Sequence, residues 1–120
     1  EAKALIAKYW PGPLTVILGG IDGRKTGFRM PANAVALELI KKAGVPVVAP
    51  SANLSGEEPP TDADSVLRQL DGKIAMLLDS GRADIGVEST VIGLTVAPAG
   101  RLREGAIKSS AIRRQLSAKA

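Results

Sequence analysis

Cysteine and histidine are both absent from this chain of 120 residues. Their absence excludes disulfide frameworks, thiol nucleophiles, Cys or His zinc sites and Ser-His-Asp triads. Any chemistry must rest on hydroxyls, amides, carboxylates, lysines, arginines and backbone amides. These groups favour catalysis by positioning and electrostatic stabilisation over covalent catalysis.

Aromatic residues are scarce as well, with one Trp, one Tyr and one Phe, so the core must consist mainly of Val, Ile, Leu and Ala. A hydrophobic content of 45% over this length is enough for one domain. Nothing resembles a signal peptide or a membrane span, so we expect a cytoplasmic protein without a membrane partner. The formal net charge of +4 indicates an anionic partner or, equally well, a mildly basic soluble surface.

Local hydrophobic patterns predict an α/β fold. We expect helices over residues 1–9, 34–43 and 63–70 and from 109 or 110 to 116. We expect strands over residues 14–18, 26–30, 45–49, 74–78, 90–94 and 101–103, the first two forming an antiparallel hairpin. Asn33 is the predicted cap of the second helix, Thr61 with Asp64 that of the third, and Ser109 or Ser110 that of the last.

The segment 49–56 is the first candidate site, because small polar residues follow directly on the apolar run 45–48. In open α/β sheets, ligands bind beyond the carboxyl ends of the strands, so Ser51 and Asn53 are well placed to hold one. On sequence alone, a turn cap at Ser51 and an Asx turn at Asn53 explain these residues equally well.

Seven ordered segments give a more specific signal. They are Trp10–Thr15, Arg29–Pro31, Ala49–Gly56, Pro60–Thr61, Asp79–Gly81, Gly86–Val91 and Leu102–Ile107. In order and spacing they resemble the YrdC family from end to end. The resemblance implies a twisted mixed α/β sheet with flanking helices around a basic cavity. It also implies that residues 1–120 are a partial YrdC-like domain whose N-terminal part, with a Thr-rich strand and a K-x-R element, is missing.

The activity implied by the resemblance is L-threonylcarbamoyladenylate synthesis from L-threonine, bicarbonate and ATP, with release of pyrophosphate. Mg²⁺ is expected with the ATP. The product would serve threonylcarbamoyladenosine (t6A) modification of tRNA through a t6A-synthesis transferase complex, and tRNA or double-stranded RNA is a further expected partner. No resident nucleophile and no protein-bound metal are expected.

Site residues are carried over from the family position by position. Arg29, Ala49 and Ser89 resemble the L-threonine contacts, with Arg29 as the carboxylate clamp. The positions that resemble ATP contacts are Ser51, Asn53, Arg103, Lys25 and Pro59. Arginine suits such a site because it stays charged and binds carboxylate or phosphate in a fork geometry. Without the resemblance, Arg29 and Arg103 could equally be solvated strand residues.

Two positions depart from the family pattern. Glu104 stands where proline is usual, beside the expected nucleotide arginine, and Gly93 replaces a common aspartate. Either departure could weaken ATP binding. Two other functions stay open. One is a non-catalytic RNA-binding or regulatory protein, of which a missing K-x-R element would be the sequence mark. The other is a carbamoyl-adenylating domain like that of HypF, ranked last because the zinc-finger and acylphosphatase modules that accompany such domains are not seen in residues 1–120.

Overall fold

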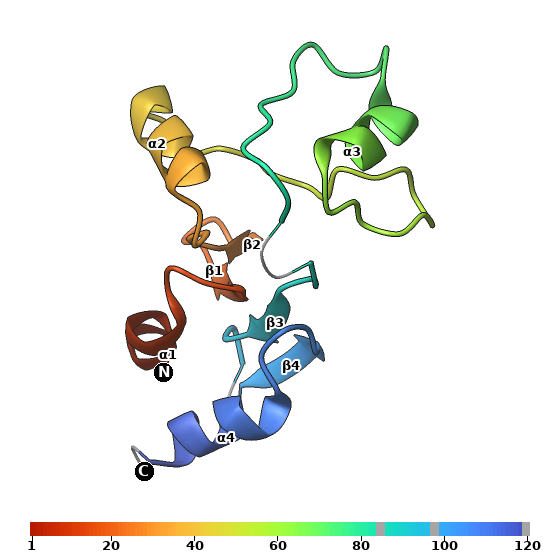
Figure 1. The fold of residues 1–120 in the computed structure, drawn as a ribbon. Helices are drawn as coiled ribbons and strands as arrows, with labels where there is room; N and C mark the ends of the chain where they lie inside the picture. The colour runs from red at the N-terminus through yellow and green to blue at the C-terminus, as the bar shows by residue number, and fades with distance from the viewer. Residues whose placement is uncertain (84–85, 97–98, 119–120) are drawn as a thin grey trace. The chain divides into compact units, whose positions relative to one another are not determined.

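The structure is a computed structural model that describes residues 1–83, 86–96 and 99–118 (Figure 1). Its helices are α1 (Ala2–Tyr9), α2 (Ala34–Ala43), α3 (Ala63–Leu70) and α4 (Ser109–Ser117). Its strands are β1 (Leu14–Gly19), β2 (Lys25–Phe28), β3 (Thr90–Gly93) and β4 (Gly100–Arg103). The chain forms two compact units: unit 1 comprises Glu1–Leu39 and Glu88–Ala120, and unit 2 comprises Ile40–Val87.

Unit 1 contains a mixed four-stranded sheet with the order β2-β1-β3-β4. The hairpin partner β2 runs antiparallel to β1, and β3 runs parallel to β1 on its other side. β4 pairs antiparallel with β3, and the register shifts between Val91 and Ile92. The predicted α/β class, the hairpin and the last two strands are confirmed.

Alternation along the strands gives the sheet one apolar face. Leu14 and Val16 of β1 and Ile92 of β3 are buried on this face, where they form a core with Leu5 of α1 and Ile112 of α4. α1 and α4 contact each other as well as contributing to this core (Figure 1). The two helices therefore cover the apolar face of the sheet.

The ends of α2 agree with the prediction. The Asn33 side-chain oxygen accepts a hydrogen bond from the Ala36 amide at 2.9 Å, as an N-cap does. Gly44 follows the helix with a φ of +67°, a left-handed conformation in which glycine is favoured.

The predicted caps of α3 and α4 were wrong in register. Asp62, not Thr61, caps α3, because its carboxylate accepts from the Ser65 amide at 2.8 Å. Neither Ser109 nor Ser110 precedes α4; the N-cap position is Lys108, which makes no side-chain capping bond. The Glu104 carboxylate accepts instead from the Ser109 amide at 2.8 Å and from the Ser109 hydroxyl.

The predicted strands 45–49 and 74–78 were also wrong. Neither segment joins a sheet among the described residues, and both are largely exposed. Val48 is 93% exposed and Met76 is 78% exposed. An apolar run becomes a strand only where a neighbouring backbone completes its hydrogen bonds, and Pro46 cannot donate one.

Among the described residues, every helix is too short or too polar to cross a membrane.

Candidate functional site

A row of polar residues crosses the face of the unit 1 sheet that lies opposite α1 and α4. Thr15 of β1 pairs with Val91 of β3, and Val91 pairs with Arg103 of β4. Residues two apart on a strand share a face, so Ser89, directly before β3, lies on the same face as Val91. Along each strand, the residues of this row alternate with buried core residues, so one strand contributes side chains to the polar face and to the core.

Ser89 is the centre of this row. Its hydroxyl oxygen lies 2.8 Å from the Thr15 hydroxyl oxygen, and the residue is only 6% exposed. Arg103 donates from Nε and Nη2 to the Ser89 carbonyl oxygen at 3.2 and 2.9 Å. Its Nη2 also lies 3.3 Å from the Ser89 hydroxyl oxygen. The structure thus brings together two of the predicted site residues, Ser89 and Arg103.

Arg103 is also paired with Glu88. Its Nη1 lies 3.4 Å from the Glu88 carboxylate, and both side chains are about half exposed. An exposed pair of this kind adds little stability, but it fixes the direction of the guanidinium. Arg103 is therefore held by Glu88 and Ser89 on the polar face, with its side chain still partly in contact with solvent.

The segment after Arg103 is fastened to the start of β3. The buried Thr90 hydroxyl donates to the Ile107 carbonyl and accepts from the Gly105 and Ile107 amides. Gly105 lies against the backbone of Glu88 and Ser89: a Cβ there would lie 2.6 Å from the Ser89 carbonyl carbon. These contacts fix Ser89 and Arg103 relative to each other.

Arg29 and Lys25 belong to the hairpin of unit 1. Continuing the pair Val16–Phe28 by one residue places Arg29 opposite Thr15, so Arg29 extends the polar row. Its Nε donates a long hydrogen bond of 3.4 Å to the Gly12 carbonyl. Lys25 pairs with Gly19 at the far end of the hairpin, and both cations are exposed.

Ala49, Ser51 and Asn53 lie in unit 2, on the exposed segment that follows α2. Ser51 is exposed and its hydroxyl makes no hydrogen bond within the described part of the chain, so a turn-capping role is not what the structure shows. The Asn53 amide nitrogen donates to the Leu54 and Glu57 carbonyls at 3.0 and 3.1 Å. Asn53 thus holds the backbone of this loop, while its expected ATP contact stays a prediction.

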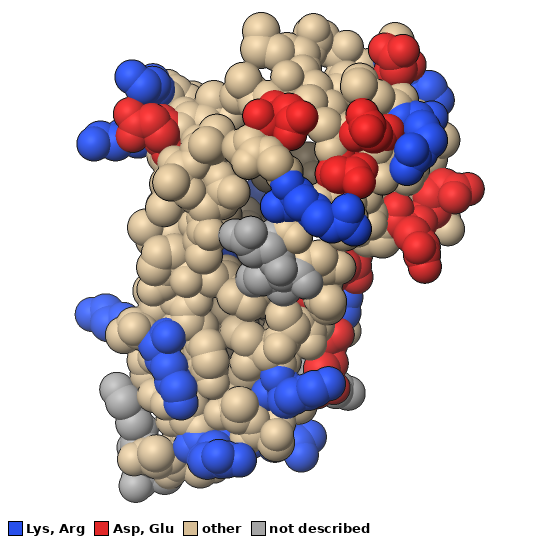
Figure 2. Space-filling view, viewed as in Figure 1, with Lys and Arg blue, Asp and Glu red and all other residues tan. Residues whose placement is uncertain are grey.

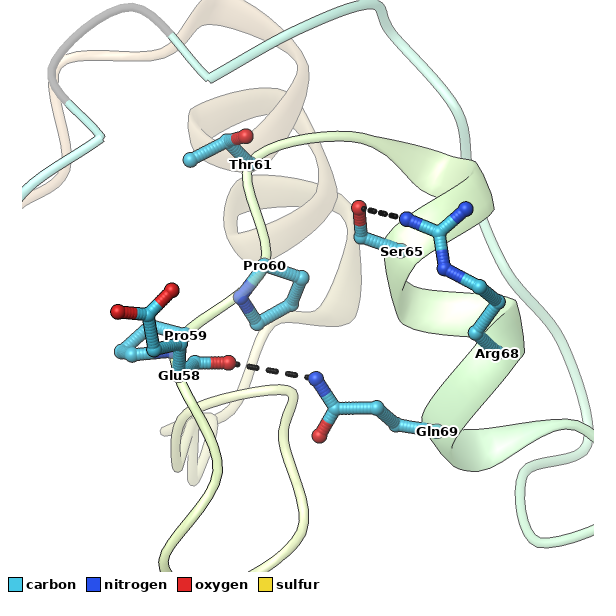
Figure 3. A pocket seen from close by; sticks show the side chains of 7 residues that line it. All are labelled: Glu58, Pro59, Pro60, Thr61, Ser65, Arg68 and Gln69. Carbon is cyan, nitrogen blue, oxygen red and sulfur yellow. Dashed lines mark hydrogen bonds between the residues drawn. The ribbon is translucent and has the colours of Figure 1, made fainter.

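Pro59 lines a pocket of about 280 Å³ within unit 2, shown in Figure 3. The other lining residues are Glu58, Pro60, Thr61, Ser65, Arg68 and Gln69. Gln69 of α3 donates to the Glu58 carbonyl at 3.2 Å and accepts from the Leu54 amide at 2.8 Å. This one side chain ties the loop that carries Asn53 and Pro59 to the helix.

Among the described residues of unit 2, Asp62 has a carboxyl group with a clearly shifted pKa. Hydrogen bonds from Ser65 lower the pKa of its carboxyl below the ordinary 3.8, with smaller contributions from the nearby Arg82 and Arg68 guanidiniums. Arg82 lies 3.5 Å from the carboxylate. Asp62 therefore caps α3 in its ionised form, and this capping role explains its lowered pKa without a ligand.

The two departures from the family pattern have structural roles. Glu104 turns to the first turn of α4, while Arg103 pairs with Glu88. Gly93 is enclosed by β4, since a Cβ there would lie 3.4 Å from the Gly100 carbonyl oxygen and 3.7 Å from Leu102. A Cβ at position 93 would therefore make ordinary van der Waals contacts with β4.

Residues 1–83, 86–96 and 99–118 contain no cluster of three Asp or Glu side chains that could hold a metal ion. Mg²⁺ commonly binds proteins through one or two carboxylates together with substrate phosphates and water. The expected Mg²⁺ therefore stays a prediction.

Thr15 and Glu88 are contacts of this site that the sequence analysis did not single out. Both lie in segments that carry the family resemblance, but neither was assigned a role. The signal for Thr15 is its alternation with Leu14 and Val16, which places a hydroxyl on the face opposite the core. For Glu88 the sequence carries no such signal, because its distance along the chain from Arg103 matches no local pattern that predicts an ion pair.

The Sua5/YciO/YrdC family model, described as "Telomere recombination", matches residues 1–105. The chain belongs to this family. Threonylcarbamoyl-AMP synthase from Pyrococcus abyssi is 44% identical over 118 residues, which cover 89% of this chain and 34% of the relative. The enzyme of the same name from Bacillus subtilis is 43% identical over 122 residues, which cover 93% of this chain and 35% of the relative.

Two solved structures share the fold of this Sua5/YciO/YrdC chain. The crystal structure of P. abyssi Sua5 complexed with L-threonine matches with a TM-score of 0.90 and 40% identity, covering 96% of this chain and 36% of that one. Escherichia coli YciO matches with a TM-score of 0.75 and 25% identity, covering 86% and 54%. The chain thus spans about a third of the length of the two synthases and of Sua5.

Proposed function

We propose that this chain contributes to a threonylcarbamoyl-AMP synthase. The observation that carries the proposal is the Ser89–Arg103 cluster on the polar face of the sheet. It belongs to a fold that matches, with a TM-score of 0.90, a Sua5 structure containing L-threonine. The names of the relatives from P. abyssi and B. subtilis point to the same activity.

The proposed reaction joins three small molecules. The amine of L-threonine takes up bicarbonate with loss of water to give a carbamate. A carbamate oxygen then attacks the α-phosphorus of ATP in line, forming the mixed anhydride threonylcarbamoyl-AMP and releasing pyrophosphate. Because carboxylate, carbamate and phosphates meet in one site, cations and hydroxyl donors are the groups required.

For L-threonine we propose Arg29, Ala49 and Ser89. Arg29 is exposed at the end of the polar row and its Nε bonds to the Gly12 carbonyl, so its terminal nitrogens would bind the carboxylate in fork geometry. Ser89 offers a hydroxyl beside the positive charge of Arg103. Ala49 would contribute backbone, since a methyl side chain has no polar atom.

For ATP we propose Ser51, Asn53, Pro59, Lys25 and Arg103. Ser51 has a free hydroxyl on a loop that Asn53 and Gln69 hold in place. Arg103 supplies a fixed cation for a phosphate. Mg²⁺ would enter on ATP and balance the phosphate charge. The product would pass to t6A modification of tRNA by a transferase complex, and we propose a cytoplasmic location.

The test is pyrophosphate release from ATP by the full-length natural protein, measured with and without L-threonine and bicarbonate. We expect release to require both, and Ser51→Ala and Arg29→Ala to lower kcat/KM about tenfold or more. Matched controls are Ser55→Ala in the same loop and Arg24→Ala at the exposed hairpin tip, which should keep wild-type rates.

Absence of threonine-dependent release by the wild type would refute the function. Normal activity in both site variants would refute the assigned residues alone.

A second function, RNA binding, is favoured by one observation. α1 and α4 contact each other and carry Lys3, Lys8, Arg113 and Arg114, and neither helix contains an acidic residue. Figure 2 shows Lys and Arg side chains over these helices, whereas both signs are mixed over α3. Tight tRNA binding that weakens steeply with salt and is lost in Arg113→Gln/Arg114→Gln would support this function. Equal binding by that variant would contradict it.

A further inference from the structure

We infer that Thr15 is a positioning residue that orients the Ser89 hydroxyl toward an anionic oxygen of the bound amino acid. The inference rests on the proposed function for the identity of that ligand. In this arrangement Thr15 donates its proton to Ser89, and Ser89 donates its own proton to the substrate. Thr15 itself does not touch the substrate.

The location of Thr15 makes it a rigid support. It lies on β1, whose backbone is paired on one side with β2 and on the other with β3. The flanking residues Leu14 and Val16 are fully buried in the core. Its hydroxyl oxygen is 2.8 Å from that of Ser89, a good hydrogen-bonding distance.

The count of protons and lone pairs around Ser89 leaves one donor unused. A serine hydroxyl has one proton and two lone pairs, whereas arginine can only donate. Ser89 therefore accepts from Arg103, and one proton is shared between Ser89 and Thr15. The second proton of the hydroxyl pair has no acceptor among the described residues.

The charge of Arg103 decides which hydroxyl keeps the unused proton when an anion binds. The guanidinium lies 3.3 Å from the Ser89 oxygen, so an anion attracted to Arg103 arrives next to Ser89. The favourable arrangement is then Thr15 to Ser89 to anion, in which each hydroxyl donates once. Such a chain strengthens the terminal donor, because each hydrogen bond polarises the next.

Thr90 shows what a purely structural hydroxyl looks like in the same strand. Its hydroxyl donates one hydrogen bond to the backbone of residues 105–107 and accepts two from it, and the residue is fully buried. The proton and both lone pairs of this hydroxyl are therefore already used within the protein. The Thr15–Ser89 pair differs because a proton remains available beside a cation.

The experiment measures L-threonine binding and steady-state kinetics in the full-length natural protein. Thr15→Val removes the hydroxyl and keeps the shape, and we expect it to weaken L-threonine binding and raise its KM about tenfold. The KM for ATP should stay within about twofold of wild type. Thr15→Ser, which keeps the hydroxyl, should restore binding, and Thr26→Val on the exposed strand β2 is the matched control.

A double-mutant cycle tests whether Thr15 acts through Ser89. In a Ser89→Ala background, Thr15→Val should cause no further loss of L-threonine affinity. If Thr15→Val does not fold, Thr15→Ala, which removes the hydroxyl without the bulk of valine, provides the same comparison.

The inference would be overturned, with the proposed function intact, if Thr15→Val bound L-threonine as tightly as wild type. It would also be overturned if Thr15→Val lowered L-threonine affinity as much in the Ser89→Ala background as in the wild type. A uniform loss of melting temperature and of both substrate affinities would overturn it in favour of a structural role. Failure of the wild type to bind L-threonine would overturn both.

Discussion

Ser89 and Thr90 are neighbours in sequence, yet their hydroxyls serve opposite faces of the sheet. Thr90 fastens the segment 105–107 on the apolar face, and Ser89 meets Thr15 and Arg103 on the polar face. This division follows from the alternation of side chains along a strand. A ligand group and its structural support can therefore occupy adjacent positions.

Gly105 lies so close to the backbone of Glu88 and Ser89 that there is no room for a side chain. In Gly105→Ala the new Cβ would lie 2.7 Å from the Ser89 carbonyl oxygen, so backbone must move. We expect a loss of about 1–3 kcal/mol in the free energy of unfolding, measured by denaturant titration. The control is Gly100→Ala, where nothing lies within 4 Å of the added atom. Equal stability of the two variants would contradict the close approach.

At the scale of elements, backbone amides in the first turns of α3 and α4 donate to carboxylates that the sequence pattern did not identify. Asp62 caps α3 from the position next to the predicted Thr61. Glu104, which directly follows β4, reaches α4 from five residues before Ser109. A local capping pattern could indicate that a helix starts nearby. It could not show which oxygen reaches the free amides, because that depends on how the preceding loop turns.

Glu104→Ala should destabilise the molecule through α4. The change removes the acceptor for the Ser109 amide, one of the unpaired donors in the first turn of a helix. We expect a loss of about 1 kcal/mol in the free energy of unfolding. Glu1→Ala is the control, because Glu1 precedes α1 without a side-chain capping bond. An unchanged stability for Glu104→Ala would show that α4 does not need this carboxylate.

The cap of α3 should make unit 2 sensitive to acid. The pKa of Asp62 is lowered in the folded state, so its contribution is complete above the ordinary value of 3.8 and is lost as the pH falls below it. Asp62→Asn keeps a capping oxygen but cannot titrate there. We expect the melting temperature of the wild type to fall more than that of Asp62→Asn as the pH falls through this range. Parallel curves would contradict the assignment.

Sequence and structure agree best where the determining contacts are local. The helix 34–43 was predicted with its cap and its terminal glycine, and the hairpin followed from two apolar runs around a glycine-rich turn. The segments 45–49 and 74–78 were misassigned because apolar content does not specify a partner strand. In the site, Ser89 and Arg103 came from family resemblance, and only the fold revealed the Thr15 and Glu88 contacts.

At the scale of the whole molecule, unit 1 holds the buried core, whereas unit 2 exposes many apolar side chains. Hydrogen exchange should report this difference. In the 120-residue chain, amides of β1, paired on both sides, should exchange on the order of a hundredfold more slowly than those of residues 45–49 and 74–78. Mass spectrometry of peptic peptides can measure both. Equal protection would mean that these segments are hydrogen-bonded.

The parallel pairing of β1 with β3 also has a consequence for synthesis on the ribosome. All of unit 2 is translated between these two strands, so the hairpin of β1 and β2 is complete about 60 residues before β3 begins. At about 5–20 residues per second, the hairpin waits roughly 3–12 seconds for its neighbour. During that interval Leu14 and Val16 lack Ile92 and Ile112, so side chains that are fully buried in the folded chain stay accessible to solvent.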